Sequence, residues 1–120
     1  ANTFKVATFA AEPASAGTPY VMYTIAGSTT GVVLGLILTN IHSSAVTAEV
    51  ELVSTTSNRS VANNTANGTS FLIKDVTIPA GSSLEILSGG KVVLETGDVL
   101  RVDCSVADKL SGTLSLMEIT

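Results

Sequence analysis

Residues 31–41, GVVLGLILTNI, form the longest run of branched apolar residues in a chain that is otherwise interrupted every few positions. Branched side chains favour β-strands, so this stretch predicts a central strand. Both faces of that strand are apolar: Val32, Leu34, Leu36 and Leu38 alternate with Val33, Gly35 and Ile37. A strand with two apolar faces is normally covered on both sides.

We expect the face with Val32 to Leu38 to fill the core of the domain. The opposite face, with Val33, Gly35 and Ile37, needs a second cover. No segment of the chain has a sustained helical period that would supply a covering helix. The strand therefore predicts that a neighbouring subunit covers its second face.

Residues 46–53, VTAEVELV, follow after a short polar connection and show the clearest alternation of apolar and polar residues in the chain. The side chains expected to point inward are Val46, Ala48, Val50 and Leu52, and those expected to point outward are Thr47, Glu49 and Glu51. Because the connection at residues 42–45 is short, the pattern predicts an antiparallel hairpin between residues 31–41 and 46–53.

Further short strands are expected at residues 3–9, 20–25, 71–78, 84–87, 91–94, 99–105 and 112–119. They are separated by turns rich in glycine, proline and polar residues, and the apolar phase of residues 71–78 shifts near Lys74 and Asp75, which indicates a β-bulge. Residues 1–10 are expected to form a strand or an N-terminal arm. The pattern predicts a single all-β domain over residues 1–120, an antiparallel sandwich or jelly-roll-like domain of about eight strands.

Residues 54–69 form a polar loop that is longer than most connections in compact domains. Its side chains predict an exposed segment, with candidate surface residues at Asn58, Arg59, Asn63 and Asn67. The three asparagines lie in N-x-S/T sequons, which would carry glycans in a secreted protein. A loop rich in asparagine, serine and threonine also produces such sequons by chance.

The charge pattern excludes several classes of partner. The net charge is -4, only 13% of the residues are charged, and no basic patch is present, so neither nucleic acid nor an anionic membrane surface is an expected partner. The run at residues 31–41 is shorter than the roughly 20 apolar residues that a membrane-spanning helix needs. An apolar chain with a surface rich in serine and threonine indicates a component of an assembly.

No catalytic or metal-binding pattern is present in the sequence. His42 and Cys104 are the sole histidine and cysteine, so neither a local metal cluster nor a convincing nucleophile pair can be assigned. A nucleophile elbow is absent, and Gly89-Gly90-Lys91 lacks the remaining residues of a phosphate-binding loop. We expect a protein that is not an enzyme and that holds no cofactor or metal.

Four segments together carry a family resemblance: TFKVAT, TPYVMYTIAGSTTGVVLGLILTNIH, FLIKDVTIPAGSSLEILSGGKVVLETGDVLRV and MEIT. In order and spacing they resemble the small virion structural proteins of tailed bacteriophages, especially marine and cyanobacterial phages. The similarity covers nearly the whole chain, although the loop at residues 54–69 is long for that family. The resemblance implies a virion component that is made in the cytoplasm of a bacterial host.

Together with the low charge, the resemblance predicts a capsid decoration protein, which binds the major capsid protein across subunit joints. It also implies self-association, with a homotrimer favoured. The candidate interface residues are Phe4 and Val6, which would pair with a capsid edge by strand addition, and Val33, Gly35 and Ile37. The alternatives are a tail, neck or fibre component, and a secreted glycosylated binding module.

Overall fold

The computed structural model describes residues 1–54 and 68–120, so the loop candidates Asn58, Arg59, Asn63 and Asn67 lie outside the described residues. The described part of the chain contains nine strands and no helix. The strands are β1 (Asn2–Glu12), β2 (Tyr20–Thr24), β3 (Thr30–Asn40), β4 (Val46–Val53), β5 (Thr69–Ile78), β6 (Ser83–Glu85), β7 (Val92–Leu94), β8 (Val99–Cys104) and β9 (Leu110–Ile119).

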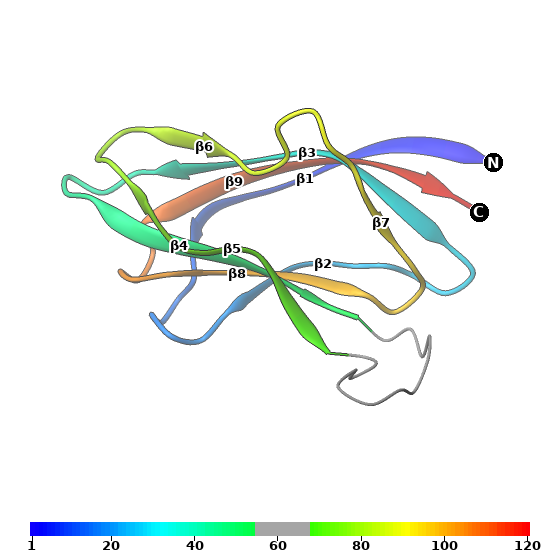
Figure 1. The fold of residues 1–120 in the computed structure, drawn as a ribbon, viewed down its shortest axis with the longest axis horizontal. Helices are drawn as coiled ribbons and strands as arrows, with labels where there is room; N and C mark the ends of the chain where they lie inside the picture. Colours follow the sequence, from blue (N-terminus) through cyan, green and yellow to red (C-terminus); the bar gives the residue numbers. More distant parts are fainter. Residues whose placement is uncertain (55–67) are drawn as a thin grey trace.

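The strands form two antiparallel sheets packed face to face (Figure 1). The first sheet has the order β1-β9-β3, with β6 and β7 both pairing with the far side of β3. The second sheet has the order β2-β8-β4-β5. The prediction of an all-β antiparallel sandwich is therefore confirmed.

The chain passes repeatedly from one sheet to the other, in the order that defines a jelly roll. Strands β6 and β7 pair with two separate parts of β3, at residues 37–39 and 31–33. Between them the chain leaves the ladder, and Gly89 there adopts a left-handed conformation with φ of 75°. Counted as one interrupted edge strand, β6 and β7 complete the eight strands of a jelly roll.

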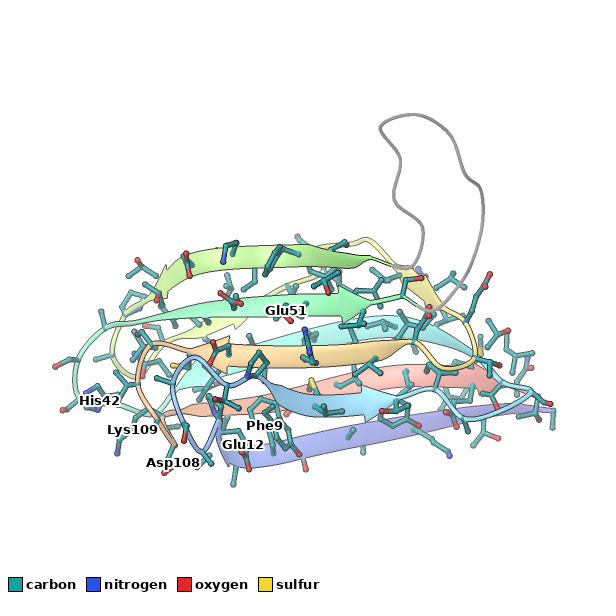
Figure 2. All side chains as sticks on the ribbon, turned by 90° about the horizontal axis from the view of Figure 1, so that it is seen from below. Phe9, Glu12, His42, Glu51, Asp108 and Lys109 are labelled. Carbon is teal, nitrogen blue, oxygen red and sulfur yellow. The ribbon has the colours of Figure 1, made fainter. Side chains whose placement is uncertain are left out.

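The predicted hairpin between residues 31–41 and 46–53 is wrong, because β3 and β4 lie in different sheets. The buried side chain of Asn40 holds the connection between them. Its Nδ2 donates to the carbonyls of Ser44 and Ile78, both at 2.9 Å, and its Oδ1 accepts the backbone N–H of His42 at 2.7 Å. These bonds satisfy backbone groups of the connection that crosses from one sheet to the other. His42 lies on this connection, at one end of the sandwich (Figure 2).

Strand β4 pairs with β8 and β5 instead, and the inward positions predicted for Val46, Ala48 and Val50 are confirmed by their burial. Leu52 is half-buried against the core, and Glu51, which the alternation places on the outside, is only 6% exposed where it pairs with Arg101. The expected bulge in β5 is also present. Ala48 lies opposite Val76 while Val50 lies opposite Ile73, so β5 has one residue more than β4 across this step. Asp75 lies in the bulge with φ of 50°.

The core lies between the inner faces of the two sheets. Full burial of one Val or Leu side chain contributes about 1.5–3 kcal/mol to stability. Both sheets supply fully buried core residues: Val33, Leu36, Leu38, Leu94, Leu110, Leu114 and Leu116 from the first sheet, and Val46, Val50, Ile78, Leu100 and Val102 from the second.

Candidate interaction face

A β-bulge in β3 determines which of its side chains reach the surface. Val33 pairs with Leu116 and Gly35 pairs with Ser115, so Leu34 is an extra residue between two consecutive partners on β9. The bulge reverses the alternation, because the inward positions are odd-numbered before it and even-numbered after it.

The face prediction for β3 is therefore partly wrong. Val33 is only 1% exposed and belongs to the core, so it is not a surface residue. Val32 and Leu34, which strict alternation places in the core, point outward. Leu36 and Leu38 are buried as expected, and Gly35 and Ile37 lie on the outer side.

The outer side of the first sheet carries exposed apolar side chains from several of its strands. Strand register places Phe4, Met117, Val32 and Val93 side by side in one row across β1, β9, β3 and β7. Phe4, Val6 and Val93 are 74%, 66% and 60% exposed. We call this surface the apolar face and define it by Phe4, Val6, Val32, Leu34, Ile37, Val93 and Met117.

The apolar face is also free of charge over its three long strands. The other outward positions of β1, β9 and β3 are glycine, alanine, isoleucine or uncharged polar residues, such as Thr8, Thr113 and Ser115. Glu85, opposite Ile37 on β6, is a charged residue at the margin. Exposed apolar patches that are larger than scattered single residues mark interaction sites.

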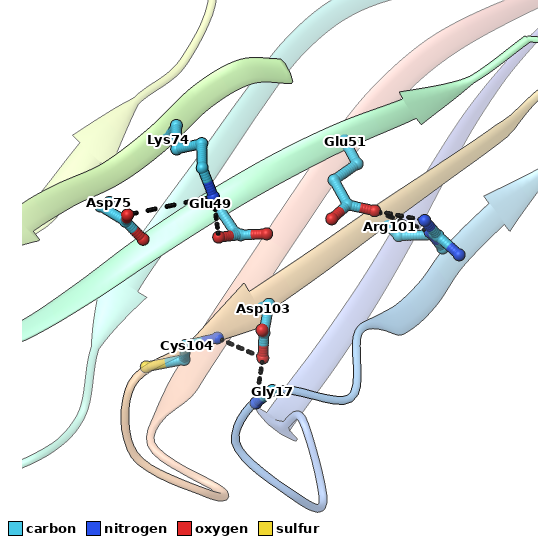
Figure 3. A network of polar contacts seen from close by, with 8 residues as sticks. All are labelled: Gly17, Glu49, Glu51, Lys74, Asp75, Arg101, Asp103 and Cys104. Atoms are coloured by element: carbon cyan, nitrogen blue, oxygen red, sulfur yellow. Dashed lines mark hydrogen bonds and ion pairs between the residues drawn. The ribbon is translucent and has the colours of Figure 1, made fainter. Parts of the chain in front are cut away.

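The outer side of the second sheet is different, because it carries a network of ion pairs across β5, β4 and β8 (Figure 3). Lys74 Nζ lies 3.3 Å from Glu49 Oε1, and Arg101 Nε donates to Glu51 Oε2 at 2.9 Å. Desolvation, followed by the hydrogen bond to Glu51, raises the pKa of Glu49. The two outer faces are thus chemically distinct, and the charged one suits water.

Besides these two ion pairs, a cluster of three polar side chains joins the two sheets near the exposed part of β1. Lys5 Nζ lies 2.7 Å from Glu118 Oε1, and the hydroxyl of Tyr23 on β2 donates to Glu118 Oε2 at 2.7 Å. Lys5 lies opposite Leu116, on the inner side of β1, and so does not belong to the apolar face. The hydrogen bonds from Lys5 and then Tyr23 hold the pKa of Glu118 below its ordinary value.

We expect Glu118→Gln to weaken the fold at neutral pH and to matter less in acid. A carboxyl whose pKa is lowered by folding stabilises the fold above its unfolded pKa, here near 4.5, and loses that contribution as pH falls through the folded pKa. Urea unfolding of the unmodified protein and of Glu118→Gln, measured from neutral to acidic pH, should show a difference in unfolding free energy that shrinks below about pH 4.5. Tyr23→Phe should have a smaller effect of the same sign. A difference that is independent of pH would contradict the assignment.

The structure brings together Phe4, Val6 and Ile37, three of the residues predicted from the sequence, and adds Val93 and Met117, which sequence reasoning missed. Gly35 lies on the outer side, where a Cβ would meet no heavy atom within 4 Å beyond its chain neighbours. A glycine inside a strand often marks a bulge, so Gly35 was the sequence signal for the reversal in β3.

The sole cysteine belongs to the core, and no metal-binding cluster is found among the described residues. Cys104 is 3% exposed in the core. Within residues 1–54 and 68–120, no group of three or more histidine, cysteine, aspartate or glutamate side chains is placed to hold a metal ion. The same part of the chain has no helix that is long and apolar enough to cross a membrane.

Comparison of the chain with protein-family models, with curated proteins and with solved structures gave no match. The candidate site therefore rests on the geometry of the apolar face.

Proposed function

We propose that this protein is a structural component of a tailed-phage virion, a capsid decoration protein that attaches to the head through its apolar face. The observation that carries the proposal is the contrast between the two outer faces. One is apolar and free of charge over β1, β9 and β3, while the other carries paired charges. A domain with this asymmetry presents one side to water and the other to a protein surface.

The resemblance and the fold both support a virion role, in different ways. The sequence segments of the resemblance include residues 3–8 of β1, all of β3 and the end of β9, which together form most of the apolar face. Jelly rolls are a common architecture of viral capsid domains. Fold alone does not imply function, so this second argument is an analogy.

The chemistry of the apolar face indicates attachment by many copies. Phe4, Val6 and Val93 are more than half exposed, and Leu34 and Ile37 are 37% and 43% exposed. The free energy gained by burying these side chains, about 25 cal/mol per Å² of apolar surface, must first offset the entropy lost on association. A single contact of this kind is modest in strength, and repetition over a symmetric capsid makes the bound layer stable through avidity.

The location in the particle is tested by the copy number in purified virions. A decoration protein occurs in a fixed ratio to the major capsid protein, and quantitative mass spectrometry of intact particles and of separated heads and tails measures that ratio. Recovery in the tail fraction alone would overturn head decoration in favour of a tail, neck or fibre role. Recovery of a glycan-bearing protein from culture medium, absent from particles, would favour a secreted module.

We expect Ile37→Lys and Val93→Lys each to weaken binding to heads that lack the protein. A lysine at Val93 lies opposite Val32 and must be desolvated without a partner, so a loss of about tenfold or more in affinity is expected. A lysine at Ile37 lies opposite Glu85 and can pair with it, so a smaller loss is expected there. Cosedimentation of heads with increasing protein concentration measures the change.

The matched control is Val21→Lys, because Val21 is 50% exposed on the outer side of the second sheet, opposite Arg101. This variant should bind as the unmodified protein does. Equal losses in all three variants, or no loss at Ile37 and Val93, would show that the apolar face is not the attachment surface.

A further inference from the structure

We propose that two copies of this chain associate through the free edge of β1, which pairs antiparallel with β1 of a second copy about a two-fold axis. The two first sheets then form one continuous sheet. The inference concerns the edge of the sheet and its backbone groups, whereas head attachment concerns the apolar face. It does not depend on the proposed function.

Among the strands of residues 1–54 and 68–120, three of the four sheet edges are protected against pairing with another strand. Strand β2 has five residues and a register shift between Val21 and Tyr23. Strand β5 is bulged, with Asp75 at positive φ, and β6 and β7 have three residues each. Short strands, bulges and charges are the usual devices that prevent edge pairing.

The fourth edge, β1, has none of these devices over its first eight residues. It is eleven residues long and stays in unbroken register with β9 from Asn2 to Phe9. Within the described residues β1 pairs only with β9, so its other side is open. A long, regular and open edge is a template for another strand.

The direction of the backbone groups on β1 follows from its pairing with β9. The terminal ammonium of Ala1 donates to the carbonyl of Thr120 at 2.9 Å, and the N–H of Thr120 donates to the carbonyl of Ala1 at 3.0 Å. Hydrogen-bonded pairs alternate along an antiparallel ladder. The odd-numbered residues of β1 therefore bond to β9, while Asn2, Phe4, Val6 and Thr8 direct their N–H and C=O groups to the open edge.

The lysine in β1 does not block this edge. A lysine on an edge strand ordinarily discourages pairing, but Lys5 lies on the inner side of the sheet and is held by Glu118 at 2.7 Å. Its backbone groups face β9, and its charge is neutralised by a side chain that is 8% exposed. The residues that direct backbone groups outward are all uncharged and exposed.

The charge distribution makes a second copy the fitting occupant. The ion-pair network lies on the outer side of the other sheet, so two copies with a net charge of -4 approach through Asn2, Phe4, Val6 and Thr8 of β1, which carry no charge. A two-fold axis at Val6 places Phe4 opposite Thr8 of the second copy, and Lys5 opposite Ala7 of the second copy. An axis at Lys5 would instead place the two lysines opposite each other, which is unfavourable.

This geometry gives a dimer, because an edge that pairs with itself closes after two copies. The homotrimer expected from the resemblance requires a head-to-tail contact between two different surfaces. The other edge of the first sheet consists of β6 and β7, with three residues each, and cannot match the length of β1. The measured mass of the free protein therefore separates the two models.

The first test is sedimentation equilibrium of the isolated protein over a wide concentration range, compared with Val6→Pro. Proline removes an N–H that faces the open edge and is not used for pairing with β9, so the fold should be kept while the dimer dissociates about tenfold or more readily. Val6→Thr keeps this N–H and should still form the dimer. A monomer at every concentration, a trimer, or a dimer unaffected by proline would overturn the proposal.

The second test needs no substitution and remains decisive if the proline variant fails to fold. Hydrogen exchange resolved by residue should show the amide of Lys5 protected at all concentrations, because it bonds to β9. The amides of Phe4 and Val6 should become protected only at concentrations where the dimer forms. Exchange at Phe4 and Val6 that is independent of concentration would exclude β1 pairing. Ile37→Lys should weaken head binding but leave the dimer intact, so the two proposals fail separately.

Discussion

Aspartate in place of Val33 is expected to prevent folding, whereas aspartate in place of Leu34, the next residue, should leave the protein folded. Val33 is 1% exposed and lies opposite Leu116 in the core, with no partner for a carboxylate. Burial of an unpaired charge, or of the neutral acid that forms in its place, costs on the order of 5 kcal/mol. A domain of this kind has a total stability of about 5–15 kcal/mol.

Leu34 is 37% exposed on the outer side of the bulge, where a carboxylate keeps its water. Circular dichroism and urea unfolding of the two variants should therefore show a loss of structure for Val33→Asp and a near-normal transition for Leu34→Asp. Ile37→Lys, which lies opposite Glu85, serves as a second outward control. The opposite order of stabilities would mean that β3 alternates without a bulge and that the apolar face is wrongly assigned.

The local pattern of the sequence was sufficient where a strand alternates regularly. In residues 46–53 each second side chain is apolar, and the structure buries Val46, Ala48 and Val50 as expected. The shift of phase at Lys74 and Asp75 was visible because a charged pair interrupts the apolar residues. In residues 31–41 almost every side chain is apolar, so the reversal at Leu34 leaves no mark in the pattern except Gly35.

The pairing of the strands was not predictable from the same information. Strand β9 lies between β1 and β3, so its partners come from the first residues of the chain and from the middle. A short connection such as residues 42–45 favours a hairpin, and the jelly roll overrides this preference through the buried amide of Asn40. Such tertiary contacts have no local signature.

The residues of the candidate site were likewise predictable only where they depend on the local pattern and not on the pairing of the strands. Phe4 and Val6 could be proposed because they alternate in an N-terminal strand, and Ile37 because residues 31–41 have a second apolar face. Val93 and Met117 reach the apolar face only because their strands pair with β3 in one particular register. A one-residue slip would turn each of them to the other side of the sheet.

Alanine in place of Gly112 is expected to destabilise the fold by about 1–3 kcal/mol, the usual cost of overpacking a core. A Cβ at this position would overlap Cε1 and Cζ of the Phe9 ring and lie 3.2 Å from a methyl group of Leu38. Phe9 is opposite Gly112 in the ladder, and its ring lies 5.2 Å from that of Tyr20, centroid to centroid. The ring therefore has little room to move away.

Gly31→Ala is the matched control, because Gly31 also lies in the first sheet and is also buried. The atom nearest to its built Cβ, at 2.6 Å, is Cδ1 of Ile25, the end of a flexible side chain that can rotate. Thermal unfolding should show a clear fall in midpoint for Gly112→Ala and a smaller change for Gly31→Ala. Phe9→Leu, which removes the ring, should cancel part of the loss at Gly112 in a double-mutant cycle. Losses that simply add would show that Phe9 is not what requires glycine at this position.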